Sequence, residues 1–291
     1  MIKAISLFSG AGGMDVGFKN AGVDVVLANE IDLNAANTFV ANHPDTKMIV
    51  GDINDNLHNF WDYTDIDLVF GGPPCQGFSV IGKMDPNDER SQLIWSFLKV
   101  VEIVRPKAFV MENVKSLATI NKWKGVREEY IKRAKELGYG CVPFVINAAE
   151  YGTPQKRERV FFIGIKDDTD FEEAIWNQIF SQRRKAPTVR QLFSDLGPAG
   201  TDRNPQTCNA KITFAVKPVM RRIPYDCLMF NGIGCPIDPD GYSRTITASM
   251  GGNMMLIVDD VFLHDPTADN WIQGYYDKLV SHEIIPEFKE A

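Results

Sequence analysis

The sequence predicts an α/β fold built on a mostly parallel sheet, followed by a smaller and less regular region. Residues 2–8 form an apolar strand that ends in the glycine-rich turn 9–13 and leads into a helix, which is how a nucleotide-type βα unit begins. Apolar strands and helices then alternate to about residue 166. We therefore expect a Rossmann-like, doubly wound sheet in a domain of residues 1–185 and a second domain in residues 186–291.

The composition is that of an ordinary soluble globular protein. The chain has 291 residues, of which 44% are hydrophobic and 24% are charged. No apolar run reaches the length of a membrane span, and the first residues predict a strand and not a signal peptide. We expect a cytoplasmic protein of bacterial type, associated with the nucleoid and not with a membrane.

The cysteines are odd in number and scattered, and none belongs to a Cys-x-x-Cys pair or has a histidine at metal-ligand spacing. This pattern favours reduced thiols over a disulfide framework, and it does not indicate a zinc site or any other bound metal. The five cysteines are Cys75, Cys141, Cys208, Cys227 and Cys235.

The net charge of −7 by itself argues against a nucleic-acid-binding protein. The charge is, however, unevenly distributed. Residues 259–291 hold eight acids and two bases, which leaves the remainder of the chain close to neutral. A near-neutral body can still present a locally basic surface to phosphates, because such contacts depend on local clustering.

Acidic residues follow the next two predicted strands. Glu30 comes after the strand 23–28, at a spacing from the glycine turn that suits a pair of ribose hydroxyls. Asp52 comes near the end of the strand 48–53, where a carboxylate can accept a hydrogen bond from an adenine amino group. Two plainer interpretations stay open: the glycine turn is a tight structural connection, and Asp32 caps the following helix.

Cys75 lies just past the carboxyl end of another buried strand. The apolar residues 68–70 are followed by Gly71-Gly72-Pro73-Pro74, so the thiol is presented by a stiff and unusual turn. In open α/β sheets ligands bind at this end of the strands. The alternative is that Cys75 is a small buried side chain with no chemical role.

Residues 80–92 are polar, contain glycine and proline, and show no periodicity. A segment of this length is more often functional than idle, although a solvated surface loop is the plainer interpretation. The helix 93–104 follows, and Pro106 ends it.

Glu112 comes at the end of the apolar strand 107–111. Burial would raise the pKa of such a carboxyl group and suit it to proton transfer. The alternative is an acid that only stabilises the start of a helix.

Two arginines alternate with Glu158 at the start of the apolar strand that runs to residue 164, so Arg157 and Arg159 are expected on one face. A charge run is usually a solvated face, but two arginines that lead into a buried strand suit recognition of phosphates or bases better.

These motifs, in this order, resemble the DNA (cytosine-5) methyltransferases of bacterial restriction-modification systems. Residues 8–13 look like the first motif of that family, residues 71–79 like its nucleophile motif, and residues 155–160 match a further motif closely. Residues 187–196 resemble the motif beside the family's target-recognition region. The resemblance covers most of residues 1–258 and predicts target recognition in the second domain.

The resemblance implies a class I fold that uses S-adenosylmethionine and needs no metal. An aromatic ring at the first position of the first motif would stack on the adenine. The implied cofactor-binding residues are Phe8, Gly10, Gly12, Glu30, Ile31, Asp52, Ile53, Pro73 and Leu93.

The implied reaction is methyl transfer to carbon 5 of a cytosine flipped out of double-stranded DNA. Cys75 would add to carbon 6 of the ring, and Glu112 would bind ring nitrogen 3 and the exocyclic amine. Arg159 and Arg157 would hold the base oxygen and a flanking phosphate. Residues 79–90 would close over the flipped base. A cognate restriction endonuclease is a further implied partner.

One departure from the family pattern concerns its final segment. The sequence has neither the expected Arg-x-Leu-Thr-x-x-Glu segment nor an Ile-Gly-Asn-Ala-Val-Pro-type motif, and residues 250–254 match the latter only superficially. Either the chain is truncated or a second polypeptide supplies this part. A further alternative is that the tail beyond residue 271, with helix-like spacing of its apolar residues, covers the gap itself.

Three functional hypotheses follow. The first is an active or complementable methyltransferase, and the second is a split or truncated DNA-binding protein without activity on its own. The presence together of Cys75, Glu112, Arg157 and Arg159 favours the first. RNA as the substrate is compatible with the same catalytic residues.

Overall fold

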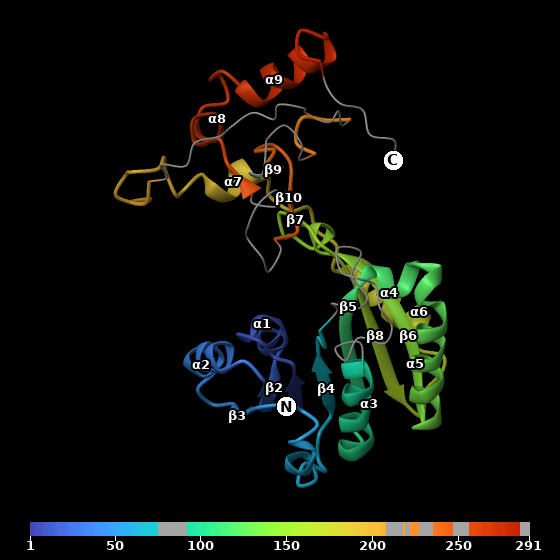
Figure 1. The fold of residues 1–291 in the computed structure, drawn as a ribbon. Helices are drawn as coiled ribbons and strands as arrows, with labels where there is room; N and C mark the ends of the chain where they lie inside the picture. The colour runs from blue at the N-terminus through green and yellow to red at the C-terminus, as the bar shows by residue number, and fades with distance from the viewer. Residues whose placement is uncertain (75–91, 208–217, 219–221, 227–234, 247–255, 286–291) are drawn as a thin grey trace. The chain divides into compact units, whose positions relative to one another are not determined.

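A computed structural model describes residues 1–74, 92–207, 218, 222–226, 235–246 and 256–285. The contacts between residues divide the chain into two compact units (Figure 1). Unit 1 comprises residues 1–146 and 158–181, and unit 2 comprises residues 147–157 and 182–291. The predicted domain boundary at residue 185 falls just after this change of unit, but the structure also groups the short segment 147–157 with unit 2.

Unit 1 is built on a seven-stranded sheet with the order β3-β2-β1-β4-β5-β8-β6. The strands β1 to β5 pair in parallel, and β8 pairs with β5 in antiparallel. The strands are β1 (Ile2–Leu7), β2 (Val23–Glu30), β3 (Lys47–Val50), β4 (Leu68–Gly71), β5 (Ala108–Val114), β6 (Tyr139–Asn147) and β8 (Glu158–Lys166). The mostly parallel α/β sheet predicted from the sequence is confirmed.

Helices connect these strands and cover both faces of the sheet. The helices are α1 (Gly13–Asn20), α2 (Leu33–Asn42), α3 (Leu93–Val104), α4 (Lys115–Thr119), α5 (Lys124–Glu136) and α6 (Glu172–Ser181). Short 3₁₀ turns occur at Leu57–Phe60, Asn121–Trp123 and Ala148–Glu150. The apolar spacing of the sequence predicts helices at 33–42, 93–104 and 123–137. The first two ranges agree with α2 and α3, and α5 begins and ends one residue inside the third.

The larger core of unit 1 lies between the sheet and the helices α3 and α5. Phe97 and Val101 of α3 and Tyr130 of α5 pack there against Phe109 of β5 and Phe162 of β8, and all five side chains are at most 1% exposed. Burial of large aromatic and branched side chains is the main source of stability in such a core. A smaller cluster on the other face joins β1, β2 and β4 to α1 through its partly buried Met14 and Phe18.

Several strands differ from their predicted bounds, among them β2, which continues through Glu30, and β3 and β5. β3 ends at Val50 and not at residue 53, because Gly51 has a φ of 130° and breaks the extended backbone. Asp52 therefore lies in the turn after the strand. β5 continues to Val114, because its pairing with β8 continues as far as Arg159. Glu112 consequently lies within a strand and does not follow one.

In the described residues of unit 2, the strands and two of the helices are short. Its strands have two residues each: β7 (Gln155–Lys156) pairs with β10 (Ser243–Arg244), and β9 (Cys235–Pro236) pairs with β11 (Leu256–Ile257). Its helices are α7 (Val189–Phe193), α8 (Asp260–His264) and α9 (Trp271–Val280). The irregular character predicted beyond residue 186 agrees with these short elements.

The tail beyond residue 271 forms a helix, as its apolar spacing predicts. Ile272, Tyr275 and Leu279 of α9 are buried, and they pack against Tyr225 and Ile257 of the same unit. These apolar side chains therefore belong to a core of unit 2.

One prediction about the cysteines is wrong. Cys235 on β9 is 1% exposed and is disulfide-bonded. The spacing of cysteines along a chain does not reveal which of them the fold brings together, and this explains the error. Cys141 on β6 is free, and burial raises the pKa of its thiol to about 12.

Candidate active site

The glycine-rich turn after β1 depends on left-handed backbone conformations. Phe8 has a φ of 54°, Gly10 of 55° and Gly12 of 88°. A Cβ atom on Gly12 would lie 2.4 Å from Nε2 of His43, so glycine is required there for space as well as for conformation. Phe8, a residue without the conformational freedom of glycine, directly follows β1 and turns the chain into the loop.

Glu30 at the end of β2 stabilises this turn through hydrogen bonds. Its carboxylate accepts a hydrogen bond from the N–H of Gly10 at 2.7 Å and another from the N–H of Asp32 at 2.9 Å. The N–H of Ser9 donates to the carbonyl of Asn29 at 3.1 Å. Asp32 also caps α2 through the N–H of Ala35, so the plainer interpretation of Asp32 is confirmed. The turn is thus tied to the neighbouring strand.

Asn29 joins β2 to the segment after β3, and the sequence reasoning missed it. Its side-chain amide donates to the carbonyls of Ile49 and Gly51, each at 3.1 Å, and the residue is 2% exposed. Asp52 follows directly, and its carboxylate accepts from the N–H of Asn54 at 2.7 Å. A polar residue at the end of an otherwise apolar strand was the available signal for Asn29.

The apolar residues predicted for the cofactor differ in exposure. Ile31 is 65% exposed beside Glu30, whereas Ile53 is 3% exposed and belongs to the larger core. Leu93 at the start of α3 and Phe8 are partly buried against the same core. Of these four side chains, Ile31 is the most open to a ligand.

A second group of predicted site residues meets where β4, β5 and β8 lie side by side. Nε of Arg159 on β8 lies 2.9 Å from Oε1 of Glu112 on β5, and both side chains are less than one fifth exposed. A further N–H group of Arg159 donates to the carbonyl of Glu158 at 2.8 Å. The antiparallel pairing of β5 with β8 places both residues on one face of the sheet.

The segment that leads to Cys75 lies against this ion pair. A Cβ atom on Gly72 would be 3.1 Å from Oε2 of Glu112, so this glycine admits the carboxylate. The side-chain amide of Asn113, which is 1% exposed, donates to the carbonyl of Pro73 at 3.3 Å. Cys75 and the predicted cover of residues 79–90 lie outside the described residues.

Arg157 is placed differently from Arg159. It lies between β7 and β8 and belongs to unit 2, where its carbonyl accepts from the N–H of Ala148 at 2.9 Å. The structure therefore brings Glu112 and Arg159 together within unit 1. The role predicted for Arg157 stays a prediction.

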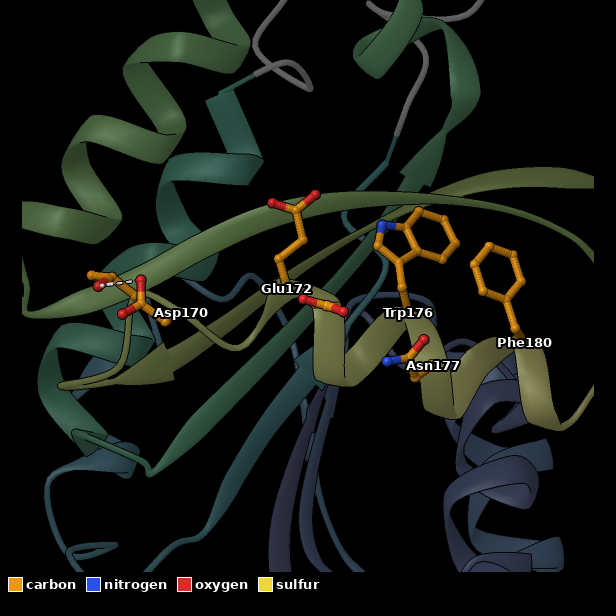
Figure 2. A pocket seen from close by; sticks show the side chains of 7 residues that line it. Asp170, Glu172, Trp176, Asn177 and Phe180 are labelled. Atoms are coloured by element: carbon orange, nitrogen blue, oxygen red, sulfur yellow. Dashed lines mark hydrogen bonds between the residues drawn. The ribbon is translucent and has the colours of Figure 1, made fainter.

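A shallow cavity elsewhere in unit 1 contains none of the predicted site residues. It has a volume of about 620 Å³ and lies along α6. Figure 2 shows Glu172, Trp176 and Phe180 on one side of that helix. The lining residues are Thr169, Asp170, Glu172, Glu173, Trp176, Asn177 and Phe180.

The described residues contain neither a cluster of metal-binding side chains nor a membrane-spanning helix. No group of three or more histidine, cysteine or acidic side chains there is arranged to hold a metal ion. No helix in the same part of the chain has the length and apolar character needed to cross a membrane.

The arrangement has two functional halves at the carboxyl ends of parallel strands. One half is the glycine turn, which is held by a hydrogen bond to the Glu30 carboxylate and suits a nucleotide-like ligand. The other half is a charged pair beside a rigid turn that leads to a cysteine, which suits covalent chemistry on a polar ring. Together with the sheet order, these features define a class I methyltransferase fold.

Comparison with known proteins supports this fold class and identifies one family within it. The profile of the C-5 cytosine-specific DNA methylase family matches residues 2–256. The type II methyltransferase M.AquIA of Picosynechococcus sp. is 41% identical over 222 residues, which make up 68% of this chain and 90% of that protein. M1.HphI of Haemophilus parahaemolyticus is 44% identical over 170 residues, or 56% of this chain and 45% of that protein. This chain thus belongs to the C-5 cytosine-specific DNA methylase family.

Solved structures show the same fold at lower identity. A putative DNA modification methyltransferase encoded within a prophage of E. coli superposes with a TM-score of 0.59 at 24% identity, covering 84% of this chain and 82% of that one. The Dnmt2 methyltransferase of S. pombe also gives 0.59 at 17% identity, with coverage of 97% and 81%. The match to M1.HphI spans less than half of that protein's length.

Proposed function

We propose that this protein transfers a methyl group from S-adenosylmethionine to carbon 5 of a cytosine in a specific sequence of double-stranded DNA, through a covalent adduct with Cys75. The observation that carries the proposal is the ion pair of Glu112 and Arg159 against Gly72 and Pro73. This contact holds an acid and a cation beside the turn that presents the cysteine.

The residues near the glycine turn fit S-adenosylmethionine. The first turn of α1 receives no side-chain cap from the described residues, so its N–H groups can bind the carboxylate of the ligand. A Cβ atom on Gly10 would meet none of the described atoms within 4 Å, which leaves room for the ligand against the backbone. Glu30 offers carboxylate oxygens to ribose hydroxyls, and the exposed Ile31 offers an apolar surface to the adenine ring. The bound cofactor would supply an electrophilic methyl group on its sulfonium.

The protein residues would act on the cytosine ring. The Cys75 thiolate adds to carbon 6, and the electrons of the 5,6 double bond make carbon 5 nucleophilic. Glu112 holds ring nitrogen 3 and the exocyclic amine, where charge develops during this addition. Arg159 orients Glu112 and binds the base oxygen, and Arg157 binds a flanking phosphate. After methylation a base removes the proton from carbon 5, and the bond from sulfur to carbon 6 breaks.

A duplex conceals the ring atoms that this chemistry requires. The target base must therefore leave the stack, which costs a few kcal/mol of unstacking and unpairing. We assign the cover over the flipped base to residues 79–90 and target recognition to unit 2. The family membership and the order of motifs support both assignments.

The covalent step is tested with a duplex that contains 5-fluorocytosine in the target site. Fluorine cannot leave as a proton, so the adduct with Cys75 should be trapped and should survive denaturation. Cys75→Ala should form no adduct. An equal yield of adduct in Cys75→Ala would show that another nucleophile, or none of the proposed chemistry, is responsible.

A second polypeptide and a cognate endonuclease belong to the same proposal. Val16 on α1 is 49% exposed, and Met14 and Phe18 are only partly buried, so an apolar surface remains beside this helix. A polypeptide that carries the family's final motif would cover this surface. Restored methyl transfer on addition of a co-encoded polypeptide would support the partner, and full activity of the purified chain alone would refute it.

A further inference from the structure

A cluster of buried polar side chains lies directly beneath the glycine turn. Asp15 of α1 is 0% exposed, Ser6 of β1 is 1% exposed and His43 at the end of α2 is 3% exposed. The hydroxyls of Ser6 and Ser9 and both carboxyl oxygens of Asp15 lack hydrogen-bond partners within the described part of the chain. Native proteins leave few buried polar atoms in this state, so four such atoms under one turn need an explanation.

His43 contacts the buried side of the glycine turn. Its ring lies against the Phe39 ring at a tilt of 42° with a centroid distance of 4.6 Å, and Nε2 lies 3.3 Å from the carbonyl oxygen of Gly12. A carbonyl can only accept a hydrogen bond, so this contact requires the hydrogen on Nε2. The absence of a side chain on Gly12 leaves the space that the imidazole occupies.

Asp15 is held in an environment that favours its neutral form. Burial raises the pKa of its carboxyl group, and this effect outweighs the opposing effects of the nearby Ser6 hydroxyl, its own N–H and the charges of His43 and Lys19. Ser6 is near enough to influence this pKa, although the two groups do not meet the geometry of a hydrogen bond. The titratable groups that act on Asp15 are His43 from α2 and Lys19 from α1 itself.

We infer that Asp15 and His43 are positioning residues of the glycine turn: the neutral carboxyl group and the imidazole hold the turn in its ligand-binding shape, and ionisation of the carboxyl group loosens it. A neutral carboxylic acid can donate a hydrogen bond, which a carboxylate cannot do. The nearby Ser6 hydroxyl on β1 is the group that protonated Asp15 on α1 could reach with a small adjustment, which would join the two elements that flank the turn, while His43 donates to the carbonyl of Gly12. This inference rests on the proposed binding of S-adenosylmethionine by the same turn.

The pH dependence has a definite sign. The folded protein favours the protonated form of Asp15 more than the unfolded chain does. The stabilisation is therefore complete below the unfolded pKa and is lost as the pH rises through the raised folded pKa. Ligand affinity should decline over the same range, because the ionised carboxyl group no longer supports the turn.

The test is calorimetric binding of S-adenosylhomocysteine to the full chain over a series of pH values from mildly acidic to mildly alkaline. Asp15→Asn keeps the shape of the neutral acid and cannot ionise. It should bind as tightly as the wild type at the lowest pH and more tightly than the wild type at the highest, with a flat profile. Asp15→Ala should bind weakly throughout. Asp24→Asn removes the same charge from an exposed site on β2 and should retain the wild-type profile.

A companion variant tests the imidazole. His43→Phe keeps an aromatic ring against Phe39 but loses the donor to Gly12, and it should weaken binding about fivefold, the value of one hydrogen bond. Thermal unfolding gives a readout that does not need the ligand. Asp15→Asn should unfold at a higher temperature than the wild type at neutral pH, and the difference should vanish as the pH falls.

The outcomes separate this inference from the proposed function. If the wild type binds S-adenosylhomocysteine and Asp15→Asn has the same pH profile as the wild type, the positioning role is wrong and the proposed function stands. If the wild type shows no binding at any pH, both fail. A uniform change in unfolding temperature with parallel affinity profiles would identify Asp15 as merely structural and would also overturn the inference.

Discussion

The two units of this protein are stabilised in different ways. Unit 1 has a continuous sheet of seven strands and a core of fully buried aromatic and branched side chains. Unit 2 has two-residue strands and a small cluster around α9. Regular strands in fixed register hold side chains from distant parts of the sequence at defined distances, and the ion pair of Glu112 and Arg159 in unit 1 depends on this.

In unit 2 the side chain of a single arginine connects several segments of the chain. Arg190 of α7 binds both carboxylate oxygens of Asp240, at 2.7 and 2.9 Å. The same side chain donates to the carbonyls of Phe262 and Leu263 at the end of α8 and lies over the Phe262 ring. In the described residues, unit 1 relies mainly on packing and strand register, whereas unit 2 combines a small apolar cluster with directional polar contacts.

The largest effect is expected for Glu112→Gln. The substitution keeps the shape of the side chain but removes its charge, so methyl transfer should slow by about 100- to 10,000-fold, as for loss of an acid–base group. Single-turnover transfer of labelled methyl groups to DNA measures this loss. Glu158→Gln removes the same charge from a more exposed position on β8 and should retain most of the activity. Equal losses of methyl transfer in the two variants would show that the ion pair of Glu112 and Arg159 has no special role in the reaction.

Gly164→Ala tests the packing of unit 1. A Cβ atom on Gly164 would lie 2.0 Å from the ring of the fully buried Phe109, so the core must shift. We expect a loss of about 3 kcal/mol in the free energy of unfolding, measured with urea. Gly125→Ala in α5 is the matched control, because its Cβ would meet open space among the described atoms. That variant should be neutral or slightly stabilising, and destabilisation of both would argue against the packing explanation.

Arg190→Ala tests the polar contacts of unit 2. Its loss leaves Asp240 and two carbonyls without their donor, and we expect a local destabilisation of about 2 kcal/mol. Hydrogen exchange should show faster opening of α7 and α8, with the strands of unit 1 unchanged. Arg203→Ala, which removes a single contact to the carbonyl of Asp195 at 3.3 Å, should have little effect. Accelerated exchange throughout unit 1 would contradict the separation of the two units.

The smallest effect is expected at a surface ion pair of unit 1. Lys3 and Asp65 lie 3.0 Å apart, but their side chains are 49% and 92% exposed. Such pairs contribute little, because water and salt screen them. Asp65→Asn should leave the unfolding temperature unchanged at both low and high salt. A clear salt-dependent decrease would show that charge, and not only packing, stabilises unit 1.

Local signals predicted the order of elements and the places where strands end. The apolar runs, the glycines of the first turn and the capping Asp32 each depend on residues within a few positions along the chain. For this reason the bounds of α2 and α3 agree with prediction, and the motifs were sufficient to indicate the family. The glycine at position 12 also has the left-handed φ that its place in the turn requires.

Contacts between distant residues could not be predicted in this way. The sequence contains Glu112 and Arg159, but only the antiparallel register of β5 and β8 sets their separation at 2.9 Å. Burial of Asp15 next to His43, the amide contacts of Asn29 and Asn113, and the disulfide of Cys235 also depend on how strands and helices pack. The sequence by itself determined which chemical groups are present and where turns begin. The tertiary structure alone decided which of those groups meet, because register and packing depend on the whole chain at once.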